Sequence, residues 1–157
     1  MANIRNTLKP LMQHGAPSPY GNAGVFRFIL MANAAGVIEN YSGSAAPVVG
    51  DVIQIGELPE GMRLDDFQAI VSTGFSGLAG KLGFQYQGDY NDANQPQDDE
   101  YFAAALPLTV GRVRAAGTKK PVTLPKPAWL TLTVTAAATG GNGRVDIVVV
   151  GELQGPR

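Results

Sequence analysis

The stretch that most constrains the fold of this chain is residues 125–153, which read PKPAWLTLTVTAAATGGNGRVDIVVVGEL. From Leu130 to Thr135 apolar residues alternate with threonines, and a period of two over that length predicts a β-strand with one buried face. Residues 140–143 then supply the glycines and the asparagine that a turn with positive φ needs. The alternation resumes at residues 145–150, where both faces are apolar. We therefore expect a C-terminal β-hairpin whose second strand is either central in a sandwich or covered by another subunit.

Other short strand patterns occur along the chain, separated by glycine, proline and small polar residues. We expect strands at residues 25–32, 36–41, 51–58, 62–73, 82–86, 106–113 and 121–124. The alanine-rich residues 98–105 favour a helical turn instead, capped by Asp98 or Gln97. About eight short strands with turn signals between them predict an all-β fold, namely an antiparallel β-sandwich of the jelly-roll type. Residues 25–157 are expected to form this single domain.

Residues 1–24 are expected to form an extended N-terminal arm, because their prolines and glycines prevent any long regular element. Four apolar residues of the arm are spaced as on one face of a short helix, although Pro10 interrupts that helix. The alternative is an extended segment whose apolar side chains bind a neighbouring subunit. In either case the expected contact residues are Ile4, Leu8, Leu11 and Met12.

Charged residues make up only 16% of the chain, well below the usual quarter, which favours an oligomer or a part of an assembly. The charges are also sorted along the sequence. Residues 39–100 carry a net charge of −9 and residues 101–145 carry +6. Opposed charged edges would suit docking of copies side by side, with Arg112, Arg114, Lys119 and Lys120 as a candidate contact edge. The alternative is chance sorting that folding mixes again.

Several classes of chemistry are disfavoured by the residues that the chain contains. It has no cysteine and one histidine, His14, so neither a Ser–His–Asp nor a Cys–His site is expected, and we predict no enzyme and no cofactor. The acidic residues 89–100 resemble a calcium loop in length, but Ala93 stands where a ligand is needed, so no metal is expected.

Nucleic acid and membrane are also not expected as partners. The basic residues 112–126 lack interleaved aromatic side chains, and the pI is about 5.7. The longest apolar run, Phe28–Ala32, is far too short to span a bilayer.

Three stretches in this order resemble the capsid decoration, or cement, proteins of tailed bacteriophages. The first is Gly50–Leu64, a strand followed by a Leu-Pro-x-Gly turn into the next strand. The second is Phe84–Asp89 with the loop to Tyr101 and Phe102, and the third is Lys126–Thr135 with its glycine-rich turn to Val145–Val149. The resemblance covers about residues 48–150.

The resemblance implies a structural virion protein that binds the outside of a phage capsid and stabilises contacts between major capsid proteins. Its expected partners are the major capsid protein and itself, as a dimer or a trimer. Its expected location is the outer capsid surface of the virion, after assembly in the host cytoplasm. The alternative is a virion surface or tail module that binds a host glycan, for which Tyr86, Tyr90 and Tyr101 are the candidate aromatic residues.

Overall fold

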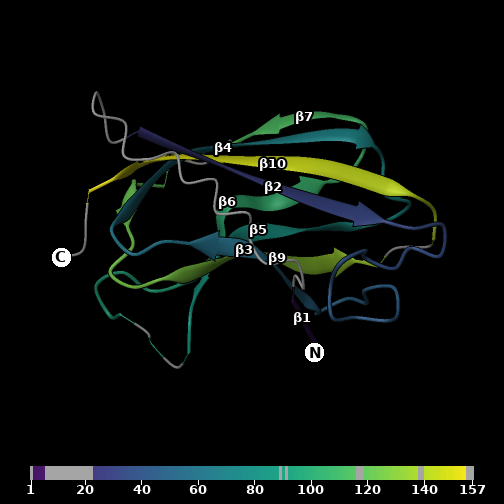
Figure 1. Cartoon of the computed structure of the whole chain (residues 1–157), viewed down its shortest axis with the longest axis horizontal. Helices are drawn as coiled ribbons and strands as arrows, with labels where there is room; N and C mark the ends of the chain where they lie inside the picture. The colour runs from purple at the N-terminus through teal and green to yellow at the C-terminus, as the bar shows by residue number, and fades with distance from the viewer. Residues whose placement is uncertain are drawn as a thin grey trace.

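The computed structural model describes residues 2–5, 23–88, 90, 92–115, 119–137 and 140–154. Within those residues every regular element is a β-strand, and the strands form two sheets packed face to face (Figure 1). None of them belongs to a helix long and apolar enough to cross a membrane. The predicted all-β sandwich is therefore confirmed.

Each of the two sheets has five strands among the described residues, and one strand pair in the first sheet is parallel. The first sheet has the order β1 (Asn3–Arg5), β3 (Val52–Leu58), β9 (Ala128–Ala136), β5 (Ala79–Tyr86) and β6 (Asp98–Pro107). The second has the order β2 (Ala23–Ala32), β10 (Gly143–Leu153), β4 (Met62–Thr73) and β7 (Gly111–Arg114), with β8 (Val122–Thr123) also paired to β4. All pairs are antiparallel except β1 with β3. The chain crosses between the sheets at most connections, and the jelly-roll type of the sandwich stays a prediction.

The alternating side chains fill the space between the sheets. On β10 the inward residues Val145, Ile147 and Val149 are fully buried, and β9 contributes a matching row that includes Leu130 and Leu132. Because β10 lies between β2 and β4, the prediction that this strand is central in a sandwich is confirmed.

The predicted C-terminal hairpin is wrong. Strand β9 belongs to the first sheet and β10 to the second, so the glycine-rich connection passes from one sheet to the other. Gly140 and Gly141 do adopt positive φ, at 105° and 100°. A Cβ on Gly143 would overlap the ring of Phe75, so this glycine lets β10 begin under an aromatic side chain. Alternation fixed which face of each strand is buried but not which strand lies beside it.

The predicted helical turn at residues 98–105 is also wrong, because β6 covers the whole stretch. The strand pairs with β5 through Phe84, Leu82 and Gly80, with two register shifts along the way. Phe102 and Leu106 of β6 are buried in the core. Packing of these side chains between the sheets outweighs the helix propensity of three consecutive alanines, which amounts to a few tenths of a kcal/mol each.

Phe28 of β2 and Gly56 of β3 hold the two sheets together at one side of the sandwich. A Cβ on Gly56 would overlap the ring of Phe28, so the aromatic ring lies directly on the backbone of β3. The register of β3 against β9 shifts between Gln54 and Gly56, which marks a β-bulge at this contact.

The start of the chain is part of the fold. Residues 3–5 form β1, which pairs with residues 52–54 of β3, and β2 begins at Ala23 rather than at residue 25. The side chain of Asp51 accepts hydrogen bonds from the backbone N–H groups of Ala2 (2.8 Å) and Val48 (3.0 Å). The N-terminal residues are thus fixed to the first sheet.

Candidate functional site

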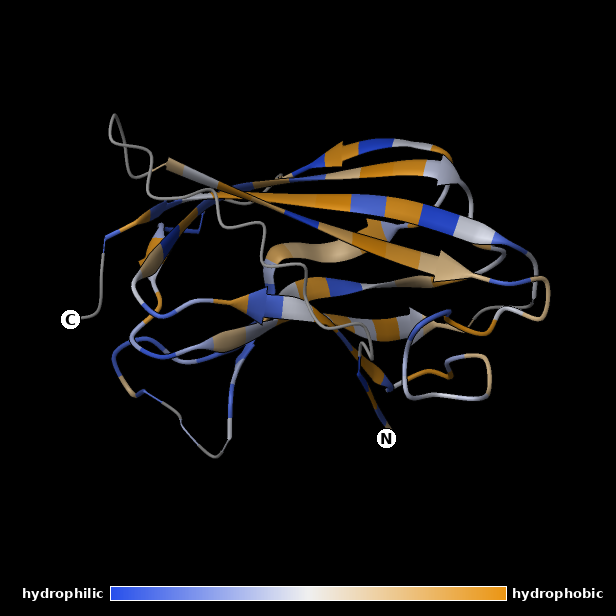
Figure 2. Cartoon of the chain, in the orientation of Figure 1, coloured by the Kyte–Doolittle hydropathy of each residue, from blue (hydrophilic) through white to orange (hydrophobic). Residues whose placement is uncertain are grey.

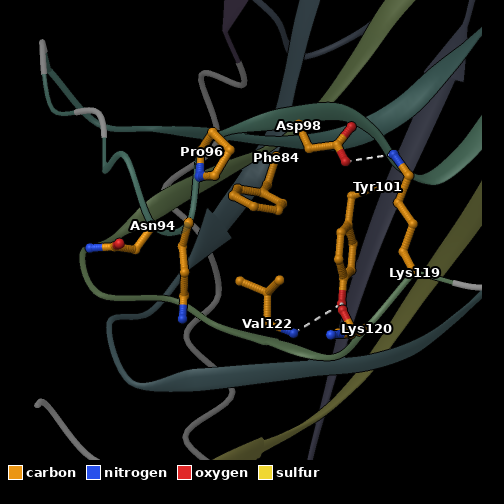
Figure 3. A pocket seen from close by; sticks show the side chains of 9 residues that line it. Phe84, Asn94, Pro96, Asp98, Tyr101, Lys119, Lys120 and Val122 are labelled. Atoms are coloured by element: carbon orange, nitrogen blue, oxygen red, sulfur yellow. Dashed lines mark hydrogen bonds and ion pairs between the residues drawn. The ribbon is translucent and has the colours of Figure 1, made fainter.

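An open pocket of about 260 Å³ lies where β6 meets the segment leading into β8 (Figure 3). Its walls are apolar and its rim carries charge. The residues that line it are Phe84, Asn94, Gln95, Pro96, Asp98, Tyr101, Lys119, Lys120 and Val122.

Tyr101 organises one side of this pocket. Its hydroxyl oxygen lies 2.9 Å from the carbonyl oxygen of Leu64 and 3.0 Å from that of Lys120, and it donates its single proton to one of them. The same oxygen accepts a hydrogen bond from the N–H of Val122 at 3.1 Å. Burial raises the pKa of this phenol, so the neutral form is kept. Tyr101 therefore ties β4, β6 and β8 together.

The four predicted basic contact residues lie along one side of the sandwich, on β7 and the segment that follows it. Arg112 and Arg114 are exposed on the edge strand β7, where Arg114 pairs loosely with Asp66 at 3.5 Å. Lys119 and Lys120 lie at the rim of the pocket. Arg112 and Arg114 thus share an edge strand, Lys119 and Lys120 share the rim of the pocket, and two of the four also have acidic partners within the chain.

The acidic partners of these basic residues come from residues 39–100, the acidic part of the sequence. Lys119 binds Asp98 at 2.5 Å, and Lys126 approaches Glu60 at 3.9 Å. Folding therefore mixes part of the sorted charge, as the alternative interpretation held. Among the described residues no ion pair involves Arg112 or Lys120, so these two carry the clearest uncompensated charge of the edge.

The predicted arm residues have different positions. Ile4, the middle residue of β1, is only 5% exposed and packs in the core cluster of its own chain. It is therefore not available to a neighbouring subunit, which differs from our expectation. Leu8, Leu11 and Met12 lie outside the described residues. They belong to residues 6–22, a segment joined at one end to β1 of the first sheet and at the other to β2 of the second.

The outer face of the second sheet carries exposed apolar side chains. Val25 is 64% exposed, Ile29 43% and Val150 36%, and Val150 is the direct cross-strand neighbour of Val25. Figure 2 shows β2 as a mostly hydrophobic strand interrupted at one position, which is Arg27. The apolar outer face of β10 was expected from the sequence, but the exposed apolar edge at β2 was not.

The aromatic residues considered for a glycan are used inside the fold. Tyr86 is buried and donates a hydrogen bond to the carbonyl oxygen of Gln95 at 2.8 Å, and burial raises its pKa to about 12. Its ring meets that of Tyr90 edge-on at 5.1 Å, and Tyr101 meets Phe84 in the same way at 5.4 Å. These rings pack against one another rather than forming an exposed stacking platform.

Two carboxylates at the end of the acidic stretch 89–100, those of Asp99 and Glu100, lie near the ammonium group of a lysine. Lys81 binds Glu100 at 2.5 Å and lies 3.9 Å from Asp99, and the hydrogen bond to Glu100 is the main reason why the pKa of Lys81 is raised. Asp89 and Asn91 lie outside the described residues. Among the residues that are described, no three acidic or histidine side chains group as metal ligands would.

Comparison with known proteins gives the class of the fold. The chain is similar to a chain in the capsid of Ralstonia phage GP4, with a TM-score of 0.65 and 19% identity over 99% of this chain and 100% of that one. It is also similar to a chain of the cyanophage Pam1 capsid asymmetric unit, with a TM-score of 0.54 and 17% identity over 85% and 86%. No protein-family model matches the sequence, and no curated protein matches it significantly. The chain therefore has a fold found in phage capsids.

Proposed function

We propose that this chain is a structural protein of a phage virion that binds the outside of the capsid and stabilises contacts between major capsid proteins. The observation that carries the proposal is the end-to-end likeness to a chain of the Ralstonia phage GP4 capsid. The match covers nearly all of both chains, so the likeness is not limited to part of either one. The strand and turn stretches that resemble decoration proteins support the same role.

Two surfaces are the proposed capsid contacts. The basic edge of Arg112, Arg114, Lys119 and Lys120 supplies orientation and association rate, since exposed charges contribute more to rate than to final affinity. Leu8, Leu11 and Met12 are the proposed apolar contacts, and each is worth about 1.5–3 kcal/mol when it is fully buried, before ordering costs.

The test is to mix the purified protein with capsid shells of its source phage that lack it and to sediment the shells. Decoration predicts saturable co-sedimentation with hundreds of copies per shell, and greater resistance of decorated shells to heat. A tail or receptor-binding module predicts few copies and no gain in shell stability. Binding of only a few copies per particle would therefore reject the proposal.

A further inference from the structure

Among the described residues the sandwich has two long edge strands, β6 and β2, and they differ in how well they are protected against pairing with another chain. Strand β6 carries Asp98, Asp99 and Glu100 at one end and Pro107 at the other, and its pairing is broken by two register shifts. Charges, proline and bulges are the features by which edge strands avoid pairing. Strand β2 has one charged residue, Arg27, and neither proline nor bulge. Its sequence AGVFRFILMA is typical of a strand covered on both sides.

The free side of β2, which is the side facing away from β10, is open over a limited stretch of the strand. The N–H of Glu39 donates to the carbonyl of Met31, and that of Asn33 donates to Val37, so residues 37–39 cover the C-terminal end of the edge. Among the described residues, no backbone hydrogen bond reaches the free side of residues 23–30.

The same hydrogen bonds show which backbone groups of β2 point outward, that is, in the plane of the sheet and away from β10. In an antiparallel sheet the N–H and C=O of one residue point to the same side, and that side alternates along the strand. Met31 uses its carbonyl on the free side, and β2 pairs with β10 without a register shift. The outward groups of the open stretch are therefore those of Ala23, Val25, Arg27 and Ile29.

We propose that this edge binds a second copy of the chain, with β2 pairing antiparallel to β2 of the partner about a two-fold axis at Phe26. Pairing about Phe28 would drive the partner strand into residues 37–39, and pairing about Arg27 would set two guanidinium groups directly opposite each other. Pairing about Phe26 sets Arg27 opposite Val25 of the partner subunit. It uses all four outward residues of both chains.

A second copy fits this edge because β2 is its own best partner. Within the described fold the other edges are short, as in β1 and β7, or protected, as in β6, so β2 is the strand that a second copy can offer. A two-fold pair also leaves no open β2 edge, whereas any other added strand leaves one of its own. The dimer joins the exposed Val25 and Val150 of both copies into one apolar strip. This inference stands on the edge alone and does not depend on capsid binding.

The first test measures the mass of the full chain in solution. It compares the wild type with a variant that has proline at a residue whose N–H points away from β10. Wild-type protein should have twice the 16.4 kDa mass of one chain in sedimentation equilibrium. Val25→Pro removes an outward N–H but no bond to β10, so it should give a folded monomer, while Val25→Thr should remain a dimer. A monomeric wild type would overturn the proposal. So would an edge occupied by residues 6–22 of the same chain, in which case Val25→Pro would lower the melting temperature of a monomer.

The second test uses the absence of cysteine from the chain. Phe26→Cys places one thiol opposite its copy in a non-hydrogen-bonded pair, where Cα atoms lie about 4.5 Å apart and a disulfide can close. Mild oxidation should convert this variant to a covalent dimer, and Phe28→Cys should stay uncrosslinked because its copy lies several residues away along the strand. A dimer in which neither variant crosslinks, or in which only Phe28→Cys does, would overturn the pairing about Phe26.

Discussion

The ammonium group of Lys119 lies 2.5 Å from the carboxylate of Asp98, so the basic part of the sequence is joined to the acidic part at the rim of the pocket. Lys120, its neighbour in sequence, lies at the same rim without an ion pair among the described residues. Two adjacent lysines thus have different surroundings. One is partly neutralised within the fold, and the other presents its charge outward.

This difference predicts separate effects for the two lysines. Lys120→Glu should slow association with capsid shells and change its dependence on salt, while the free energy of unfolding changes by no more than about 0.5 kcal/mol. Lys119→Glu would in addition place a second carboxylate beside that of Asp98, so it should also lower stability. Stopped-flow light scattering at several salt concentrations measures the rate. Identical kinetics for wild type and Lys120→Glu would show that the basic edge does not guide docking.

Tyr101→Phe should destabilise the sandwich by about 1–3 kcal/mol, because it leaves the partly buried carbonyl and N–H partners of the hydroxyl unpaired. Tyr90→Phe is the matched control, since its hydroxyl binds Asp92 in an acidic surface loop and its loss should cost less. Urea unfolding followed by circular dichroism measures both. Equal losses for the two variants would contradict the role given to Tyr101.

Gly56→Ala should destabilise the protein by about 1–3 kcal/mol, because the new methyl group would occupy the place of the Phe28 ring. Phe28→Leu alone should also be destabilising, through the loss of aromatic packing. If the overlap is the cause, the double variant should be more stable than the sum of the single losses predicts. If the losses in the free energy of unfolding were strictly additive, the cost of Gly56→Ala would not come from overlap with Phe28.

Asp51 should make part of the stability depend on pH. The N–H groups of Val48 and then Ala2 stabilise the carboxylate and hold its pKa below the ordinary value. The pKa is lower in the folded state, so this contribution is fully present above about pH 4 and is lost as the pH falls through the folded pKa. The stability difference between wild type and Asp51→Asn should therefore shrink in acid. Unfolding curves that stay equally far apart at every pH would refute this.

Replacing Leu8, Leu11 and Met12 together with serine should weaken capsid binding without changing the melting temperature of the sandwich. Deleting residues 1–20 would be a poorer experiment, because it would also remove β1 and take Ile4 out of the core. Co-sedimentation with shells and thermal unfolding are the two readouts. Undiminished binding by the triple variant would remove the segment from the proposed contact.

Local patterns predicted most strands but not their neighbours, and the strand expected at residues 36–41 is only an isolated bridge from Ile38 to Ala32. The apolar residues at 62–73 and the alternation at 82–86 identified β4 and most of β5, because burial of one face selects residue types along a strand. Partner choice depends on residues distant in sequence, which is why β9 and β10 were assigned to a hairpin. The β6 stretch was assigned by helix propensity, although its core contacts decide its conformation. Ile4 was interpreted as part of an arm because nothing local reveals its pairing with β3.

The position of β10 in the second sheet has a consequence for how the protein is made. Strand β2 emerges from the ribosome more than a hundred residues before its partner β10. Until then the apolar strand has neither this partner nor a sheet to join, and sheets assembled from such distant segments form slowly. The second sheet therefore closes only after β10 has been translated. During that interval β2 is the segment that chaperones would need to shield from aggregation.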